Sequence, residues 1–254
     1  MAGEPDAFEP PRAAGPRIRW GLPDVAVAWI VGVVAAVIAG SIVGAATGVK
    51  AGRVGDDVGV LLASVVGQAI GVIGTLALVS ARKGRGSLSD DFGLVPRLPG
   101  RSWTTATLWV LGGIALQVVS LPFLQLLVDV HGKVETQDVV EQFEHARGPT
   151  LILFAVLVVT VAPVAEELLF RGALLRGLQR RMSPAWAALL SALAFAAVHP
   201  LSSPTIGSVI AVPALFALGL VSAAAAIRTG DLSRSILLHA GFNLLTAVTV
   251  VVSR

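Results

Sequence analysis

Apolar residues form seven long runs along the chain, each separated from the next by a short polar stretch. An α-helix needs about 20 such residues to cross the hydrocarbon core of a bilayer, and most of the runs are close to that length. The pattern predicts an all-α fold, a polytopic transmembrane helical bundle of about seven spans. The runs cover residues 24–49, 58–81, 104–128, 150–170, 185–199, 206–227 and 235–252.

The fifth run, at residues 185–199, is the shortest of the seven. It is preceded by Pro184 and followed by Pro200. Proline has no backbone N–H and clashes with the preceding helical turn, so it disfavours the interior of a helix. We therefore expect these two prolines to mark the ends of the fifth helix.

Composition supports a membrane location. Of the 254 residues, 55% are hydrophobic and 14% charged, and the mean hydropathy is +0.81, outside the range of soluble domains. There is no cysteine, which excludes disulfides, thiol nucleophiles and cysteine-ligated metals. Arginine greatly outnumbers lysine, and alanine, valine and glycine are abundant, as in GC-rich bacterial genomes. We expect an integral protein of a bacterial plasma membrane, with the lipid bilayer as its surroundings.

Residues 1–23 differ from the rest because they are rich in proline, glycine and charge and contain no apolar core of a signal peptide. Such a composition predicts a disordered cytoplasmic tail, followed by an integral membrane domain at residues 24–254. Although the net charge is +3, the basic residues form no dense patch, so we expect no nucleic-acid partner. The oligomeric state is left open by the sequence.

The basic residues are distributed unequally between alternate loops. Cytoplasmic loops carry the excess of Lys and Arg in membrane proteins, and 14 of the 19 lie inside if the N-terminus is cytoplasmic. The sequence therefore predicts seven spans with the N-terminus inside and the C-terminus outside. His131 and His145 then lie in an acidic outer loop, where we expect them at the surface. The five outer basic residues are Lys50, Arg53, Lys133, Arg147 and Arg254.

Glycines recur at intervals of four in the first two runs. This spacing places small residues on one helix face and allows close helix contact. We expect packing of the first two helices within the bundle, with dimerisation as the alternative. The residues are Gly40, Gly44 and Gly48 in the first run and Gly67 and Gly71 in the second.

Two adjacent carboxylates follow the fourth apolar run. Glu166 and Glu167 precede Arg171 in the segment "EELLFR", and a carboxylate in hydrocarbon costs at least about 2.5 kcal/mol. Glu167 and Arg171 are four residues apart and can pair on one helix face, whereas Glu166 is rotated by about 100° from Glu167. The spacing predicts that one carboxylate is neutralised by the arginine and that Glu166 is free for chemistry.

Three more polar residues lie in apolar runs. His199 ends the fifth run, and His239 and Asn243 are one turn apart in the seventh. An antiparallel hairpin turning at residues 181–184 would bring Glu166 and His199 to a similar depth. A single residue of this kind often serves helix packing, but together they favour one site in a polar catalytic chamber, inside the bundle and walled by the fourth, fifth and seventh spans.

This set of residues is suited to amide hydrolysis. A carboxylate near a histidine can take a proton from water, and a second histidine with an amide can stabilise the oxyanion that forms. The alternative is a non-catalytic scaffold or immunity protein, or a small transporter, that uses the same polar cluster for binding. A transporter would be expected to contain internal repeats, and the sequence has none that we recognise.

Three short segments resemble motifs of a known family. "EELLFR", "FAAVH" and "HAGFN" are similar, in this order, to the EExxxR, FxxxH and HxxxN motifs of the CAAX prenyl protease 2 / lysostaphin resistance protein A-like family. These intramembrane endopeptidases are also called CPBP or Abi proteins. The resemblance places a protease-like core at about residues 104–252. It implies membrane-associated substrates, either prenylated CAAX-type proteins or peptides such as bacteriocins.

The resemblance also implies a role for each motif residue. Glu166 corresponds to the general base that activates water together with His199, and His239 and Asn243 correspond to the oxyanion site. Members of the family are in places described as metalloproteases, so zinc held by Glu166, His199 and His239 is an alternative. No HExxH spacing is present, and we expect a site without metal. Supporting roles fall to Glu167, Arg171 and Phe195.

Overall fold

The structure is a computed structural model that describes residues 18–49, 57–131, 148–202 and 205–252. Regular structure within these ranges is entirely helical, which confirms the predicted all-α fold. In the part of the chain that the structure describes, six helical segments are long and apolar enough to cross a membrane. They are α1 (Leu22–Thr47), α2 (Val58–Lys83), α4 (Trp103–His131), the segment Gly148–Gln179, α9 (Pro184–Ser202) and α10 (Ile206–Thr229).

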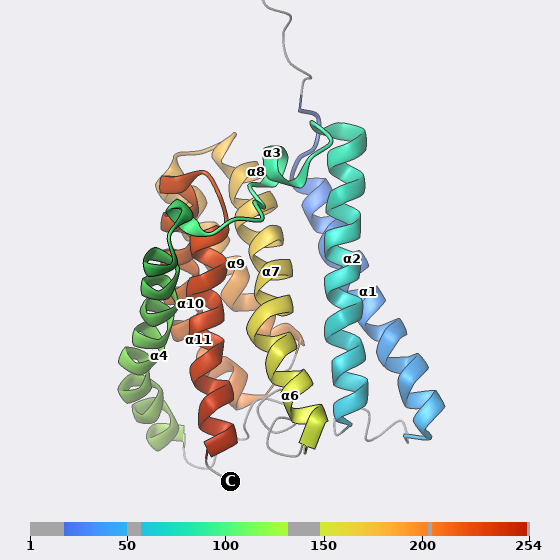
Figure 1. Ribbon diagram of the computed structural model, residues 1–254, viewed down its shortest axis with the longest axis vertical. Helices are drawn as coiled ribbons and strands as arrows, with labels where there is room; N and C mark the ends of the chain where they lie inside the picture. The colour runs from blue at the N-terminus through green and yellow to red at the C-terminus, as the bar shows by residue number, and fades with distance from the viewer. Residues whose placement is uncertain (1–17, 50–56, 132–147, 203–204, 253–254) are drawn as a thin grey trace, which may run out of the picture.

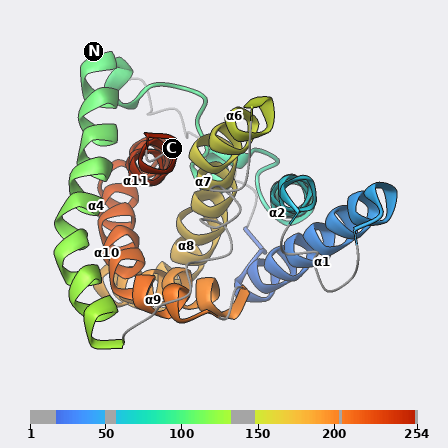
Figure 2. The ribbon, with the colours of Figure 1, turned by 90° about the horizontal axis from the view of Figure 1, so that it is seen from below.

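A seventh helix, α11 (Ser233–Val252), completes the bundle. It is 20 residues long and packs mainly against α4 and α10. Successive long helices run in opposite directions, so the described N-terminal residues and the C-terminus lie at opposite ends of the bundle (Figure 1). The segment Gly148–Gln179 lies between the α1–α2 pair on one side and α4, α10 and α11 on the other (Figure 2).

The predicted glycine faces join α1 to α2. A Cβ on Gly67 would lie 2.6 Å from the backbone oxygen of Ala35, and one on Gly71 would lie 2.9 Å from the Cα of Gly32. Such contacts need glycine, which confirms the prediction of packing within the chain. Gly48 differs from that prediction: it is the C-cap of α1, at φ +72°, a conformation that favours glycine.

The fourth span is longer and less regular than the sequence predicts. It consists of α6 (Gly148–Val156), the π-helical segment η3 (Leu157–Val161), α7 (Ala162–Glu167), the π-helical segment η4 (Leu168–Leu174) and α8 (Leu175–Gln179). The helix therefore continues nine residues past the expected end at residue 170. The predicted hairpin turn at residues 181–184 is confirmed, since α8 ends just before it and α9 begins at its last residue.

Pro200 corrects another expectation. It lies inside α9, which continues to Ser202. A proline in the final turn removes only one backbone hydrogen bond, so the helix extends two residues beyond it. Of the two outer histidines, the side chain of His131 and the whole of His145 lie outside the described residues.

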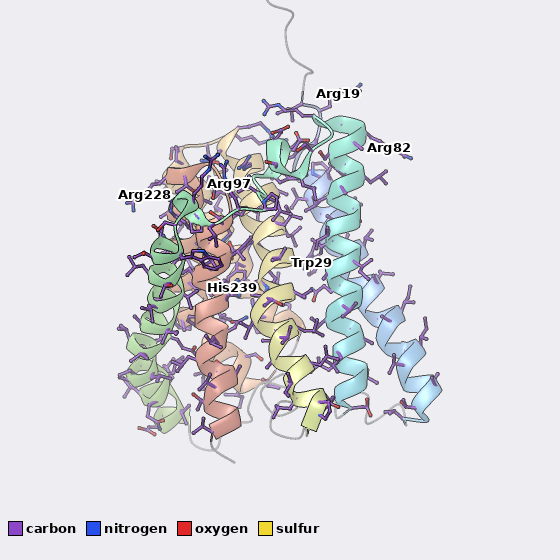
Figure 3. The ribbon with its side chains drawn as sticks, in the orientation of Figure 1. Arg19, Trp29, Arg82, Arg97, Arg228 and His239 are labelled. Atoms are coloured by element: carbon purple, nitrogen blue, oxygen red, sulfur yellow. The ribbon has the colours of Figure 1, made fainter. Side chains whose placement is uncertain are left out.

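Polar contacts hold the end of the bundle at which the described chain begins. The short helix α3 (Leu88–Phe92) carries Asp91, which is buried and accepts hydrogen bonds from Trp20 Nε1 at 3.4 Å and Ser80 Oγ at 2.5 Å. Trp20, which the sequence analysis assigned to the tail, packs under the Arg180 guanidinium at 3.8 Å. Arg19, Arg82, Arg97 and Arg228 lie at this same end (Figure 3). We call it the basic end.

Candidate active site

The two adjacent carboxylates lie between two π-helical segments. Glu166 and Glu167 end α7, with η3 before it and η4 after it. A π-helical turn contains an extra residue and rotates the side chains that follow, and such turns are frequent at functional sites. Adjacent positions on α7 point about 100° apart, so the two carboxylates have different surroundings: the Glu167 side chain is fully buried, whereas the Glu166 side chain is 27% exposed.

Glu167 forms the predicted pair with Arg171. Arg171 Nη1 donates to Glu167 Oε1 at 2.9 Å, and neither side chain is exposed. The guanidinium also lies over the Phe195 ring, 4.3 Å from its centroid, a cation–π contact that strengthens when it is shielded from water. Removing either partner of such a buried pair leaves the other charge uncompensated, so this pair belongs to the framework of the site.

His239 connects the two carboxylates. Its Nδ1 lies 3.1 Å from Glu167 Oε1, and its Nε2 lies 3.7 Å from Glu166 Oε2. An ionised carboxylate can only accept a hydrogen bond, so the Nδ1 atom carries a proton and donates it to Glu167. The ring is thus oriented by Glu167, and its Nε2 faces Glu166.

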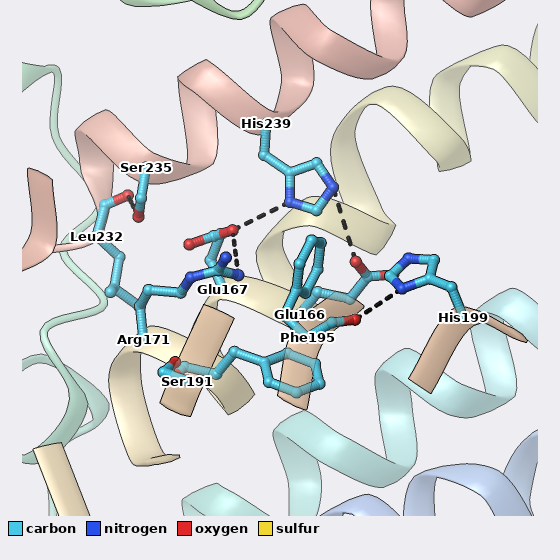
Figure 4. Close-up of polar contacts among 10 residues, drawn as sticks. Glu166, Glu167, Arg171, Ser191, Phe195, His199, Leu232, Ser235 and His239 are labelled. Carbon is cyan, nitrogen blue, oxygen red and sulfur yellow. Dashed lines mark hydrogen bonds and ion pairs between the residues drawn. The ribbon is translucent and has the colours of Figure 1, made fainter. Parts of the chain in front are cut away.

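His199 approaches Glu166 from the other side. Its Nδ1 lies 2.8 Å from the backbone oxygen of Phe195. A carbonyl only accepts, so Nδ1 carries the proton and Nε2 has a lone pair. The Phe195 ring packs edge-on against both imidazoles, at centroid distances of 4.9 Å to His199 and 5.4 Å to His239. Figure 4 shows the Glu166 carboxylate between the two histidine rings.

Asn243 lies apart from these side chains. Its Nδ2 donates to the backbone oxygen of Val158 in η3 at 2.9 Å. The structure therefore brings together six of the seven predicted residues, whereas the side chain of Asn243, on α11, contacts η3 instead. The six are Glu166, Glu167, Arg171, Phe195, His199 and His239. The amide nitrogen has a second proton, which this bond does not use.

Glu166, His199 and His239 are the residues that would hold a metal ion if one were bound. Among the described residues there is no group of three or more His, Cys, Asp or Glu side chains placed to hold a metal ion. Both histidines donate from Nδ1 to acceptors within the protein, an arrangement that orients the ring and is also usual for histidines that ligate a metal through the other nitrogen.

A cavity of about 240 Å³ lies beside this cluster, toward the basic end. Its walls come from η4 and α8 on one side and the end of α10 on the other, that is, from the fourth and sixth spans. The chamber predicted among the fourth, fifth and seventh spans is a different place, and it stays a prediction. The cavity is lined by Arg171, Leu175, Arg176, Gln179, Ala226, Ile227 and Gly230.

Residues 148–245 match a family model described as "Type II CAAX prenyl endopeptidase Rce1-like". This segment is an Rce1-like domain. The match confirms the family predicted from the three motifs and contains all seven site residues named from them. Comparisons with curated proteins and with solved structures found no match. The Rce1-like domain thus combines a protease-family sequence with a buried carboxylate–histidine cluster in a membrane protein.

Proposed function

We propose that the protein is an intramembrane endopeptidase that hydrolyses peptide bonds with a water molecule activated by Glu166. The observation that carries the proposal is the position of Glu166. It is the partly exposed member of the carboxylate pair, it faces His239 Nε2 at 3.7 Å, and Arg171 is already paired with Glu167. The protease family of the domain agrees with this chemistry.

In the proposed reaction Glu166 takes a proton from water, while the lone pair on His199 Nε2 accepts a hydrogen bond from the same water. The hydroxide attacks the carbonyl carbon of the peptide bond, and the carbonyl oxygen becomes an oxyanion. This oxyanion accepts a hydrogen bond from the second amide proton of Asn243 and, when His239 Nε2 carries a proton, one from that nitrogen. The C–N bond then breaks, and Glu166 passes its proton to the leaving amine. Water and one amide are consumed, and one acid and one amine are formed.

The first test is hydrolysis of a fluorogenic peptide by the protein reconstituted in lipid vesicles. We expect His199→Ala to lower kcat by a factor of about 100 or more, because the water loses the acceptor that orients it for attack. Trp186→Ala is the control, because Trp186 lies on the same helix and is exposed. Equal rates for wild type and His199→Ala would contradict the proposal, and an unchanged rate after chelation is expected if no metal takes part.

For the substrate, we propose a lipidated peptide. An apolar groove of about 450 Å³ lies between α4, α10 and α11 and includes Leu238, the residue next to His239. A groove with this lining suits a hydrocarbon chain, and the family description names prenylated substrates. The groove is lined by Leu108, Trp109, Gly112, Ala115, Leu116, Val119, Val221 and Leu238.

A bulky residue in this groove tests the substrate class. Ala115→Trp is expected to raise KM for a farnesylated peptide and to leave KM for the unprenylated peptide unchanged. Val118→Trp is the control, since Val118 is exposed on the same helix outside the groove. The idea of a lipidated substrate is wrong if both variants act alike on both peptides.

We also propose that the basic end faces the cytoplasm, in accordance with the excess of Lys and Arg there. The chain has no cysteine, so single cysteines can report orientation. Arg181→Cys, at the basic end, is expected to react with a membrane-impermeant thiol reagent from the cytoplasmic side. Thr47→Cys, at the end of α1 that is farther from the basic end, is expected to react from the outside. Labelling of both from one side would contradict this orientation.

A further inference from the structure

Val158 has a backbone carbonyl for which the helix provides no donor. In an α-helix this oxygen would accept from Ala162, but the N–H of Ala162 donates to Leu157 in the π-helical pattern. The π-helical donor to Val158 would be residue 163, which is Pro163 and has no N–H. Both regular donors to Val158 are therefore lost in the segment just before Glu166.

Asn243 supplies the missing donor from another helix. Its side-chain amide on α11 donates to the Val158 oxygen at 2.9 Å. An unpaired polar group in a membrane interior costs more than one facing water, and a buried unsatisfied group costs about 1–3 kcal/mol. The amide thus replaces the bond that Pro163 removes and ties η3 to the helix that carries His239.

The second π-helical segment has a comparable tie. Ser191 on α9 is fully buried, and its Oγ donates to the backbone oxygen of Phe170 in η4 at 2.9 Å. The same carbonyl also accepts the N–H of Leu175, five residues on. This tie joins η4 to the helix that carries His199.

We propose that Asn243 and Ser191 are positioning residues: each fixes one of the two π-helical segments around Glu166 and Glu167 to the helix that provides a catalytic histidine. The two bonds set the rotation of α7 relative to α9 and α11, and with it the direction of the Glu166 carboxylate. This role is additional to the oxyanion role of Asn243 in the proposed function, and Ser191 has no place in the three motifs.

A double-mutant cycle tests the Asn243 tie without any activity assay. Asn243→Ala is expected to lower the Tm of the purified protein by about 3–6 °C, the shift for a loss of about 1.5 kcal/mol in a chain of this size. In a Pro163→Ala background, position 163 regains a backbone N–H. Either this N–H donates to the Val158 carbonyl, or the helix returns to the α-helical pattern, in which the N–H of Ala162 donates to Val158 instead of Leu157. There, the same Asn243 substitution is expected to cost less than about 1 °C.

Equal Tm losses in the two backgrounds would overturn the Asn243 tie, and they would do so whether or not the protein is a protease. An absence of peptide hydrolysis in the wild type together with a clear coupling in the cycle would instead contradict only the proposed function. The two failures are therefore distinguishable.

Ser191 is tested by catalysis, with a matched buried serine as the control. Ser222 is also fully buried, and its Oγ has no hydrogen-bond partner among the described residues. Ser191→Ala is expected to lower kcat about 10- to 100-fold with KM changed less than about twofold, as for a misplaced catalytic group. Ser222→Ala should leave both constants unchanged, and equal kcat values for the two variants would overturn the role of Ser191.

Discussion

The α1–α2 pair and the Rce1-like domain are held together in different ways. In α1 and α2, glycines allow the backbones to approach closely, and the contact between them is formed by small and apolar residues such as Gly67 and Ala35. In the Rce1-like domain, by contrast, α7, η4, α9 and α11 surround a buried ion pair and two histidines. Helices in a membrane can therefore pack through small residues or around buried polar side chains. Only the polar arrangement provides side chains that can take part in a reaction.

The largest effect is expected from breaking the buried pair. Arg171→Met removes the guanidinium and leaves the Glu167 carboxylate buried without its cation, a loss of about 3–5 kcal/mol in the free energy of unfolding. Thermal unfolding of the purified protein measures it. The exposed Arg181→Met, ten residues further along the chain, should leave the Tm unchanged. A similar Tm for both variants would mean that the pair contributes little to the fold.

A smaller loss is expected in the glycine-packed pair. Gly67→Ala would place a Cβ 2.6 Å from the Ala35 backbone oxygen, and overpacking of this kind costs about 1–3 kcal/mol. Gly74→Ala, where a Cβ meets nothing within 4 Å, is the matched control. The kcat of the folded Gly67→Ala protein should stay within about twofold of the wild type, because no catalytic group moves. A large fall in kcat would mean that α1 and α2 help to shape the site.

The smallest effect is expected from the ion pair between Lys83 and Asp24 at the basic end. The two atoms are 2.5 Å apart, but the Lys83 side chain is 50% exposed. Water and salt screen such a pair, so Lys83→Met should cost no more than about 0.5 kcal/mol. Denaturation at low and high salt measures it. A loss comparable to that of Arg171→Met would contradict the distinction between buried and exposed pairs.

Much of this architecture could be predicted from the sequence because its signals are local. Apolar runs gave the helices, the spacing of four gave the Glu167–Arg171 pair and the α1–α2 glycine contact, and residues 181–184 gave the hairpin turn. Each of these depends on regular helix geometry over a few residues. They were therefore predictable without knowledge of the neighbouring helices.

The remaining features depend on contacts between helices. The two π-helical segments change the helical rotation by an extra residue each, and no residue spacing indicates them, although Pro163 shortly before the carboxylates is a signal in retrospect. The hydrogen bond of Asn243 to Val158 and that of Ser191 to Phe170 join residues 85 and 21 positions apart. The orientation of His239 by Glu167, 72 positions away, could not be predicted for the same reason.

Two adjacent carboxylates with different roles are central to this account, and the same one-atom change at each position tests them most directly. Glu166→Gln should lower kcat for peptide hydrolysis by a factor of about 10²–10⁴ and leave the Tm within about 1 °C of the wild type, because this side chain is partly exposed and is not needed to balance Arg171. Glu167→Gln should instead lower the Tm strongly, because it leaves Arg171 buried and unpaired. Wild-type kcat in Glu166→Gln, or equal losses of Tm in the two variants, would contradict the assignment of Glu166 as the base.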